Sequence, residues 1–229
     1  MVIGGLQKFS LSDFPGKISA IVYTQGCSFR CRYCHNPELV DPSRYGPAIP
    51  PARVLDFLAS RAGKLQGVVV TGGEPTLQPD LPQFLMAIRQ LGFDIKLDTN
   101  GSNPDLLAQI IASGLIDYLA MDIKAPIDGY RRVTGVEPAA RDIERSIGLV
   151  IGSGLPHELR TTYEESLLSA EDLAGIARLA RGARLLVLQS FRPTKALDGE
   201  MLTRPTPDRA SLDRARRAME AAGVPVLVR

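Results

Sequence analysis

Short apolar runs alternate along the chain with longer segments in which apolar residues recur every three or four positions. The short runs predict buried strands, and the longer segments predict amphipathic helices. We expect strands at residues 19–24, 67–70, 93–97, 118–123, 159–163, 185–189 and 224–228. We expect helices at residues 54–61, 81–91, 104–113, 139–151, 170–180 and 207–222.

This alternation is typical of an α/β fold, in which helices cover a parallel sheet. Six strand–helix units are too few for a full eight-stranded barrel, so an incomplete, curved (β/α)6 barrel with parallel strands fits the pattern. Asn103 is expected to cap the helix at 104–113, and Pro104 is expected at its first position.

Length and composition indicate one globular domain over residues 1–229. The chain is 45% apolar and 23% charged, and its net charge of +2 gives no electrostatic reason to bind nucleic acid or an anionic membrane. It has no Gly/Ser linker and no run of about 18 apolar residues that would span a membrane. The N-terminus lacks the regions of a secretory signal, so we expect a cytoplasmic location, where thiols stay reduced.

All three cysteines of the chain, Cys27, Cys31 and Cys34, lie within one short segment that follows the first predicted strand. Their odd number argues against a disulfide framework. Thiolates are strong ligands for iron–sulfur clusters, and a cluster with four cysteine ligands would need one more than the chain has. Three thiolates from one loop can hold three corners of a cubane [4Fe–4S] cluster and leave the fourth iron open to a substrate.

Three alternatives to the cluster are a haem, a zinc ion and a segment of free thiols without a cofactor. Cys31 to His35 spells C-x-x-C-H, the attachment motif of a c-type haem, but haem would leave Cys27 unused and requires export. A zinc site of three cysteines and His35 would place two adjacent residues on one tetrahedron, which is awkward. Three buried free thiols would have to cluster by chance. The cluster is therefore favoured.

Polar segments follow the other predicted strands, at the edge where parallel α/β sheets bind ligands. They are expected at residues 71–75, 98–101, 122–124, 160–162 and 189–192. Gly72 and Gly73 would let the backbone approach a ligand closely. Asp98 and Asp122 would lie at neighbouring strand ends, where two carboxylates repel unless a proton or a cation intervenes.

The C-x3-C-x2-C spacing with Tyr33 before the last cysteine resembles the signature of radical S-adenosylmethionine (SAM) enzymes. The flanking residues, Gly26 and His35 to Pro37, resemble one branch, the activases of glycyl radical enzymes. Within that branch the chain is most similar to the activating proteins of anaerobic ribonucleoside-triphosphate reductase. The similarity runs from Phe14 to the last strand.

The resemblance implies a [4Fe–4S] cluster on the three cysteines and a SAM molecule on its open iron. An electron from a flavodoxin or ferredoxin would cleave SAM to methionine and a 5′-deoxyadenosyl radical, which would take a Cα hydrogen from a glycine of a partner enzyme. The cofactors carry the chemistry, so no side chain is expected to act as nucleophile or general base.

The resemblance also implies roles for polar residues around the loop. The segment Gly72-Gly73-Glu74 would take the SAM amino group, and Tyr33 would stack on adenine. Asp98, Thr99 and Asp122 would hold Na⁺ or K⁺. The remaining expected SAM contacts are Asp98, Asn100, Lys124, Arg160 and Arg192. Ion pairing between Lys124 and Asp122 or Asp98 is an alternative, and His35 and Asn36 are expected to orient the loop.

Other functions stay open from the sequence. A pyruvate formate-lyase-type activase would differ only in its docking surface. A small-molecule enzyme such as 7-carboxy-7-deazaguanine synthase shares the cofactors, although the Gln-Gly-Glu-Gly segment expected near its N-terminus is missing. A non-catalytic zinc or electron-transfer protein is the hypothesis from another class. Two long loops, at 41–51 and 192–207, are either partner-docking segments or variable surface.

Overall fold

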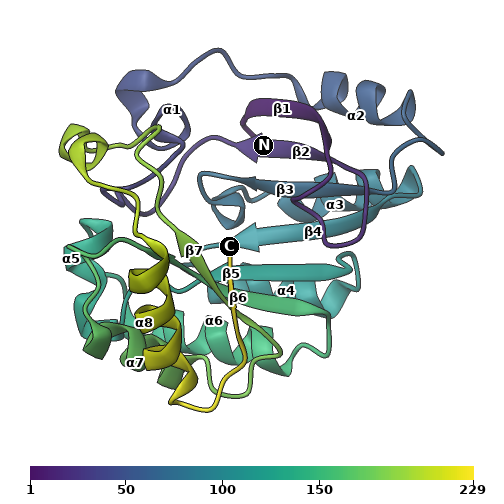
Figure 1. The fold of residues 1–229 in the computed structure, drawn as a ribbon. Coiled ribbons are helices and arrows are strands. Elements are labelled where there is room, and N and C mark those ends of the chain that lie inside the picture. The colour runs from purple at the N-terminus through teal and green to yellow at the C-terminus, as the bar shows by residue number, and fades with distance from the viewer.

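The computed structural model describes all 229 residues and contains one eight-stranded sheet with the strand order β1 to β8 (Figure 1). Strands β2 to β8 are parallel, and each pairs with the next strand along the chain. They are β2 (Ser19–Thr24), β3 (Gly67–Gly72), β4 (Asp94–Thr99), β5 (Tyr118–Asp122), β6 (His157–Tyr163), β7 (Leu186–Ser190) and β8 (Val226–Val228). All seven predicted strands are therefore confirmed, with bounds shifted by at most two residues.

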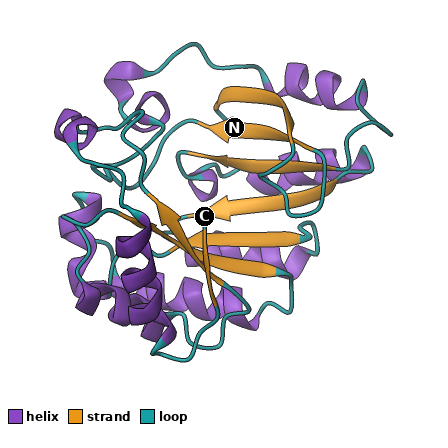
Figure 2. Ribbon diagram, viewed as in Figure 1, coloured by secondary structure: helices purple, strands orange, loops and turns teal.

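Helices connect the parallel strands, and Figure 2 shows them gathered along the outer side of the curved sheet. The helices are α1 (Pro37–Val40), α2 (Pro51–Ala59), α3 (Leu81–Gln90), α4 (Pro104–Ser113), α5 (Tyr130–Thr134), α6 (Ala140–Gly152), α7 (Ala170–Leu179) and α8 (Arg209–Glu220). Short 3-10 helices lie at η1 (Pro42–Arg44), η2 (Pro75–Leu77), η3 (Ile127–Gly129) and η4 (Gly199–Thr203). The six predicted helices are all present, and the short helices α1 and α5 were not predicted.

The sequence signals for individual helices agree with the structure. In α3 the apolar stripe of Leu81, Phe84, Leu85 and Ile88 is buried, as an amphipathic helix packed on a sheet requires. In α4 the side chain of Asn103 accepts a hydrogen bond from the N–H of Leu106, which is an N-cap interaction.

Strand β1 (Ile3–Ser10) was not predicted, and it is the one antiparallel strand of the sheet. Its strand partner is β2, and on the other side it makes only an isolated bridge from Ile3 to Ile49, so it forms the edge of the sheet. Its sequence contains Gly4 and Gly5, and glycine is uncommon in strands. It also lacks the regular alternation of apolar and polar residues that predicts a half-buried strand.

The sheet curves but does not close, because the edge strands β1 and β8 do not pair with each other. This is the expected incomplete barrel. Parallel pairing brings the carboxyl ends of β2 to β7 to the same rim, where the connecting loops begin. No helix of the chain is long and apolar enough to cross a membrane.

Candidate functional site

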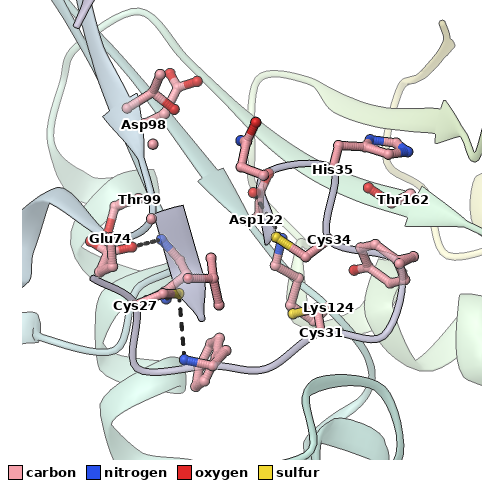
Figure 3. A pocket seen from close by; sticks show the side chains of 18 of the residues that line it. Cys27, Cys31, Cys34, His35, Glu74, Asp98, Thr99, Asp122, Lys124 and Thr162 are labelled. Carbon is pink, nitrogen blue, oxygen red and sulfur yellow. Dashed lines mark hydrogen bonds and ion pairs between the residues drawn. The ribbon is translucent and has the colours of Figure 1, made fainter. Parts of the chain in front are cut away.

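The predicted polar segments meet in one cavity of about 230 Å³ at the carboxyl ends of the strands (Figure 3). Every strand from β2 to β7 contributes to its lining, through its last residues or the loop that follows it. The lining includes Cys27, Cys31, Tyr33, Cys34, Gly72, Gly73, Glu74, Asp98, Thr99, Asn100, Asp122, Lys124, Arg160, Thr162 and Gln189. Thus ligand-type residues from six separate strand ends surround a single space.

The three cysteines are free and face this cavity from the loop after β2. Burial raises the pKa of Cys27 to about 11 and that of Cys31 to about 12, and it also raises the pKa of Cys34. Without a metal the thiols are therefore protonated, and metal binding would release their protons. Three soft donors from one loop, with no fourth cysteine in the chain, fit a cluster that keeps one iron open.

Hydrogen bonds from neighbouring elements hold the cysteine loop. The sulfur of Cys27 accepts from the N–H of Phe29 at 3.4 Å and faces the side-chain nitrogen of Asn100 at 3.7 Å. Farther along the loop, the N–H of Arg30 donates to the Thr134 carbonyl at 2.8 Å. Asn100 therefore lies beside a predicted cluster ligand.

Gly72, the last residue of β3, and Gly73, which follows it, are required by close packing against the start of the cysteine loop. A Cβ on Gly73 would lie 2.0 Å from the Gly26 carbonyl oxygen, and one on Gly72 would lie 2.3 Å from the Thr24 nitrogen. The N–H of Gly73 donates to the Thr24 carbonyl at 2.9 Å. No donor of the chain reaches the Gly73 carbonyl, which leaves this oxygen free to accept from a ligand.

Glu74 is fully buried, and its carboxylate joins the loops after β3 and β4. One oxygen accepts from the N–H and the hydroxyl of Thr76 at 3.0 and 2.6 Å and from the hydroxyl of Thr99 at 2.7 Å. The other accepts from the N–H of Asn100 at 2.6 Å (Figure 3). Burial raises the pKa of Glu74, although these hydrogen bonds oppose the rise. Only the backbone of this residue is left to contact a ligand.

Arg160 lies between the two carboxylates that were expected to repel each other. Its Nε is 2.7 Å from Asp122 Oδ1, and its Nη1 is 2.9 Å from Asp98 Oδ2. Lys96 pairs with Asp98 at 2.6 Å, and Lys124 pairs with Asp122 at 2.9 Å. Burial alone would raise the pKa of each aspartate, but the basic partners outweigh it and hold both values low.

These ion pairs change the reasoning for a monovalent cation. The repulsion between Asp98 and Asp122 is already balanced by side chains of the protein, and the hydroxyl of Thr99 donates to Glu74. A Na⁺ or K⁺ at this position would have to displace the guanidinium of Arg160. The cation stays a prediction, and this arrangement gives it no support.

Tyr33 is 3% exposed, and its hydroxyl has no hydrogen-bond partner in the protein. Burial raises its pKa, so the hydroxyl stays protonated. The ammonium of Lys124 lies 5.8 Å from the centre of the ring, within the range of a cation–π contact. An unpaired buried hydroxyl is costly, and a ligand in the cavity could satisfy it.

Arg192 is the one expected SAM contact whose side chain the structure does not bring to the cavity. The residue is exposed, and its carbonyl oxygen is 3.0 Å from Nε2 of His35. The His35 ring also stacks on Phe191 at 5.7 Å, in agreement with the expected orienting role of this histidine. Thr162 and Gln189, for which the sequence predicts a place at strand ends but no ligand role, also line the cavity.

Comparison with known proteins gives the family. A model described as the Radical SAM superfamily matches residues 21–181, so the chain belongs to this superfamily. A protein of Methanocaldococcus jannaschii, provisionally named a glycyl-radical enzyme activating enzyme, is 31% identical over 212 residues, covering 90% of this chain and 86% of that protein. The pyruvate formate-lyase-activating enzyme of Clostridium pasteurianum is 33% identical over 206 residues, covering 83% of each.

More distant similarities extend beyond the activases. The 7-carboxy-7-deazaguanine synthase of Thermococcus kodakarensis is 26% identical over 82% of this chain and 79% of its own length. The crystal structure of Streptococcus suis SuiB bound to precursor peptide SuiA superposes with a TM-score of 0.71 at 15% identity, covering 91% of this chain and 48% of that one. That likeness shows the fold alone. Superfamily membership implies a [4Fe–4S] cluster and SAM, which the donor set of the cavity fits.

Proposed function

We propose that this protein is an activase that generates a glycyl radical on a partner enzyme, which we take to be anaerobic ribonucleotide reductase. The observation that carries the proposal is the cavity with three free thiols from one loop and a rim of polar groups from the neighbouring strand ends. The similarity to named activating enzymes over most of the chain supports the same class. When bound, the cluster would supply the electron that cleaves SAM to methionine and a 5′-deoxyadenosyl radical.

The residues of the chain would bind, orient and shield the cofactors. Cys27, Cys31 and Cys34 would hold the cluster. The free Gly73 carbonyl would accept a hydrogen bond from the SAM amino group. Lys124 carries a full positive charge, because its pairing with Asp122 outweighs burial and keeps its pKa well above the usual value. That charge would favour the SAM carboxylate as a point-charge partner.

The remaining polar residues would define the rest of the SAM site. Tyr33 would face the adenine, and Asn100 would hold Cys27 in place. Arg160 would keep the Asp98 and Asp122 carboxylates ionised and fixed, so that they accept hydrogen bonds from the ligand.

A protein substrate suits the open sheet, since the unpaired edges of β1 and β8 leave the barrel incomplete on one side. A glycine loop of a partner could approach the cavity from there. We expect a flavodoxin or ferredoxin as electron donor and a cytoplasmic location, where the thiols stay reduced. We also propose that residues 1–229 fold as one domain.

The test is a comparison of partners under anaerobic conditions. Reconstituted protein, SAM and a reductant are mixed in turn with anaerobic ribonucleotide reductase and with pyruvate formate-lyase, and the glycyl radical is measured by EPR. A doublet on the reductase, absent with a variant in which its radical glycine is replaced by alanine, is the expected result. A radical only on pyruvate formate-lyase would reassign the partner. No radical on either, with turnover of the 7-carboxy-7-deazaguanine synthase substrate, would overturn the activase proposal.

A further inference from the structure

One segment outside the cavity makes several contacts with the cysteine loop and with the residues that follow it. We call residues 192–203, between β7 and α8, the strap. At its start, the Arg192 carbonyl is 3.0 Å from Nε2 of His35. Next along the strap, the ammonium of Lys195 pairs with the carboxylate of Glu38 at 2.5 Å. Both contacts lie just after Cys34 in the chain, so the strap touches the segment that follows the last predicted cluster ligand.

The strongest contact of the strap involves Arg32, which lies between the predicted ligands Cys31 and Cys34. The Arg32 guanidinium donates through Nε to the carboxylate of Asp198 at 2.7 Å. In the opposite direction, the backbone N–H of Asp198 donates to the Arg32 carbonyl at 3.0 Å. Asp198 of the strap therefore contacts both the side chain and the main chain of Arg32 in the loop.

A second carboxylate also reaches Arg32, but it is far more exposed. Glu200 accepts from Nη2 of Arg32 at 2.9 Å, and its side chain is 74% exposed, against 29% for Asp198. The other oxygen of Asp198 accepts from the N–H of Glu200 at 2.9 Å, so Asp198 also caps η4. Asp198 is thus fixed on its own element while it holds Arg32.

The loop is also tied to α5. There the N–H of Arg32 donates to the Val133 carbonyl at 3.4 Å, and the N–H of Arg30 donates to the Thr134 carbonyl at 2.8 Å. The peptide units on either side of Arg32 are therefore held from two directions. Because the thiols of a metal site must converge within a few tenths of an ångström, groups beyond the ligands commonly fix the ligand-bearing backbone.

We propose that Asp198 is a positioning residue that acts through Arg32 to keep Cys31 and Cys34 in the geometry that retains the cluster. The inference rests on the proposed function in one respect, the cluster itself. Asp198 does not line the cavity, so its effect passes through the loop and not through contact with a cofactor.

The test uses Asp198→Asn with Glu200→Gln as the matched control. The asparagine oxygen can still accept from the N–H of Glu200, but its NH2 group then faces the Nε–H of Arg32, two donors that repel each other. Each protein is reconstituted anaerobically, and iron and sulfide per chain, the EPR spectrum of the reduced cluster and the rate of iron loss to a chelator are measured. The unfolding temperature of the metal-free proteins is recorded as well.

We expect Asp198→Asn to lose iron faster than wild type by a factor of about 1.5 to 5, the range that a partly exposed ion pair supports. Glu200→Gln should match wild type, and the metal-free unfolding temperatures should agree. The Arg32→Gln variant should lose iron as fast as Asp198→Asn, and the double variant no faster than either, since both act through one contact.

Equal rates for Asp198→Asn and wild type would overturn the inference and leave the proposed function intact. A faster rate that follows a lowered unfolding temperature of the metal-free protein would also overturn it, because the effect would be general destabilisation. Additive effects in the double variant would contradict action through Arg32. A wild-type protein that binds no iron would overturn the proposed function together with the inference.

Discussion

At the scale of single residues, Gly73 is the position at which the site tolerates least change. A Cβ there would lie 2.0 Å from a backbone oxygen and 2.7 Å from the backbone carbon of Gly26, and neither can move without shifting the cysteine loop. We predict that Gly73→Ala lowers the free energy of unfolding by about 1–3 kcal/mol, as overpacking does. Chemical denaturation of the metal-free protein measures this, and an unchanged midpoint would contradict the packing described here.

Gly148 provides the control for that substitution. It lies on α6, and a Cβ added there would have no atom within 4 Å. Gly148→Ala should therefore raise the free energy of unfolding by about 0.5–1 kcal/mol, because alanine favours the helix over glycine. Opposite signs for the two variants would separate steric conflict from a general response to alanine.

Arg160 is the second residue with a strong expected effect. It neutralises Asp98 and Asp122, and its side chain is only 12% exposed, so removing its charge would leave two carboxylates without their shared partner. We predict that Arg160→Gln lowers the free energy of unfolding by about 3–5 kcal/mol, the usual cost of breaking a buried ion pair.

The double variant Asp98→Asn with Arg160→Gln tests the cause of that loss. It removes the charge of one of the two carboxylates that lose the guanidinium, so it should recover part of the stability that Arg160→Gln loses. Additive losses in the double variant would show that the ion pair is not the source of the effect.

At the scale of elements, the start of α7 offers a prediction that depends on pH. Ser169 and Asp172 form a capping box, and Arg132 pairs with Asp172 at 2.8 Å. Burial would raise the pKa of Asp172, but the N–H and hydroxyl of Ser169 and the guanidinium of Arg132 outweigh it and lower the pKa below its ordinary value of 3.8. The folded state therefore favours the ionised carboxylate, which adds stability above pH 3.8 and loses it as the pH falls further.

We predict that Asp172→Asn costs about 1 kcal/mol near neutral pH, because it removes the charge that pairs with Arg132 and weakens the capping box at its N3 position. The difference from wild type should shrink as the pH falls below 3.8. Urea denaturation at several pH values measures both quantities. A stability difference between wild type and Asp172→Asn that stays constant down to pH 3 would contradict the role assigned to the charge. It would instead assign the effect to hydrogen bonds that do not depend on ionisation.

Elements also differ in how far the sequence predicted them. Strands β2 and β3 were predictable because they are almost wholly buried and read as continuous apolar runs, such as Val68 to Val70. Strand β1 was not, because an edge strand that contains two glycines and is half exposed lacks both that run and a regular alternation. Its pairing with β2 is a tertiary interaction that no local signal records.

The same contrast holds in the site. The convergence of the cysteines and the strand-end segments on one cavity was predictable, because parallel strands bring their ends together. The partners of Glu74 and Arg160 were not, because they depend on which side chains of neighbouring strands come within hydrogen-bond distance. The exposed side chain of Arg192 shows why this prediction failed for one residue: a position after a strand does not decide which way a side chain points.

At the scale of the whole molecule, the chain combines an eight-stranded sheet with a site at the rim formed by the carboxyl ends of the parallel strands. Strands β3 to β7 each supply at least one lining residue, and the loop after β2 supplies the cysteines, so the cavity depends on the register from β2 to β7. Three free thiols with raised pKa values lie in this cavity. Cluster binding would tie the loop to the sheet and stabilise the folded chain by mass action.

The central claim is that these three thiols hold a cluster that cleaves SAM. The most direct measurement is anaerobic reconstitution with iron and sulfide, followed by reduction, addition of SAM and chromatography for 5′-deoxyadenosine. Wild type and Cys31→Ala are run side by side. We predict about four irons per wild-type chain and 5′-deoxyadenosine formation that Cys31→Ala abolishes. Zinc binding without iron, or 5′-deoxyadenosine formation that does not depend on Cys31, would contradict the account.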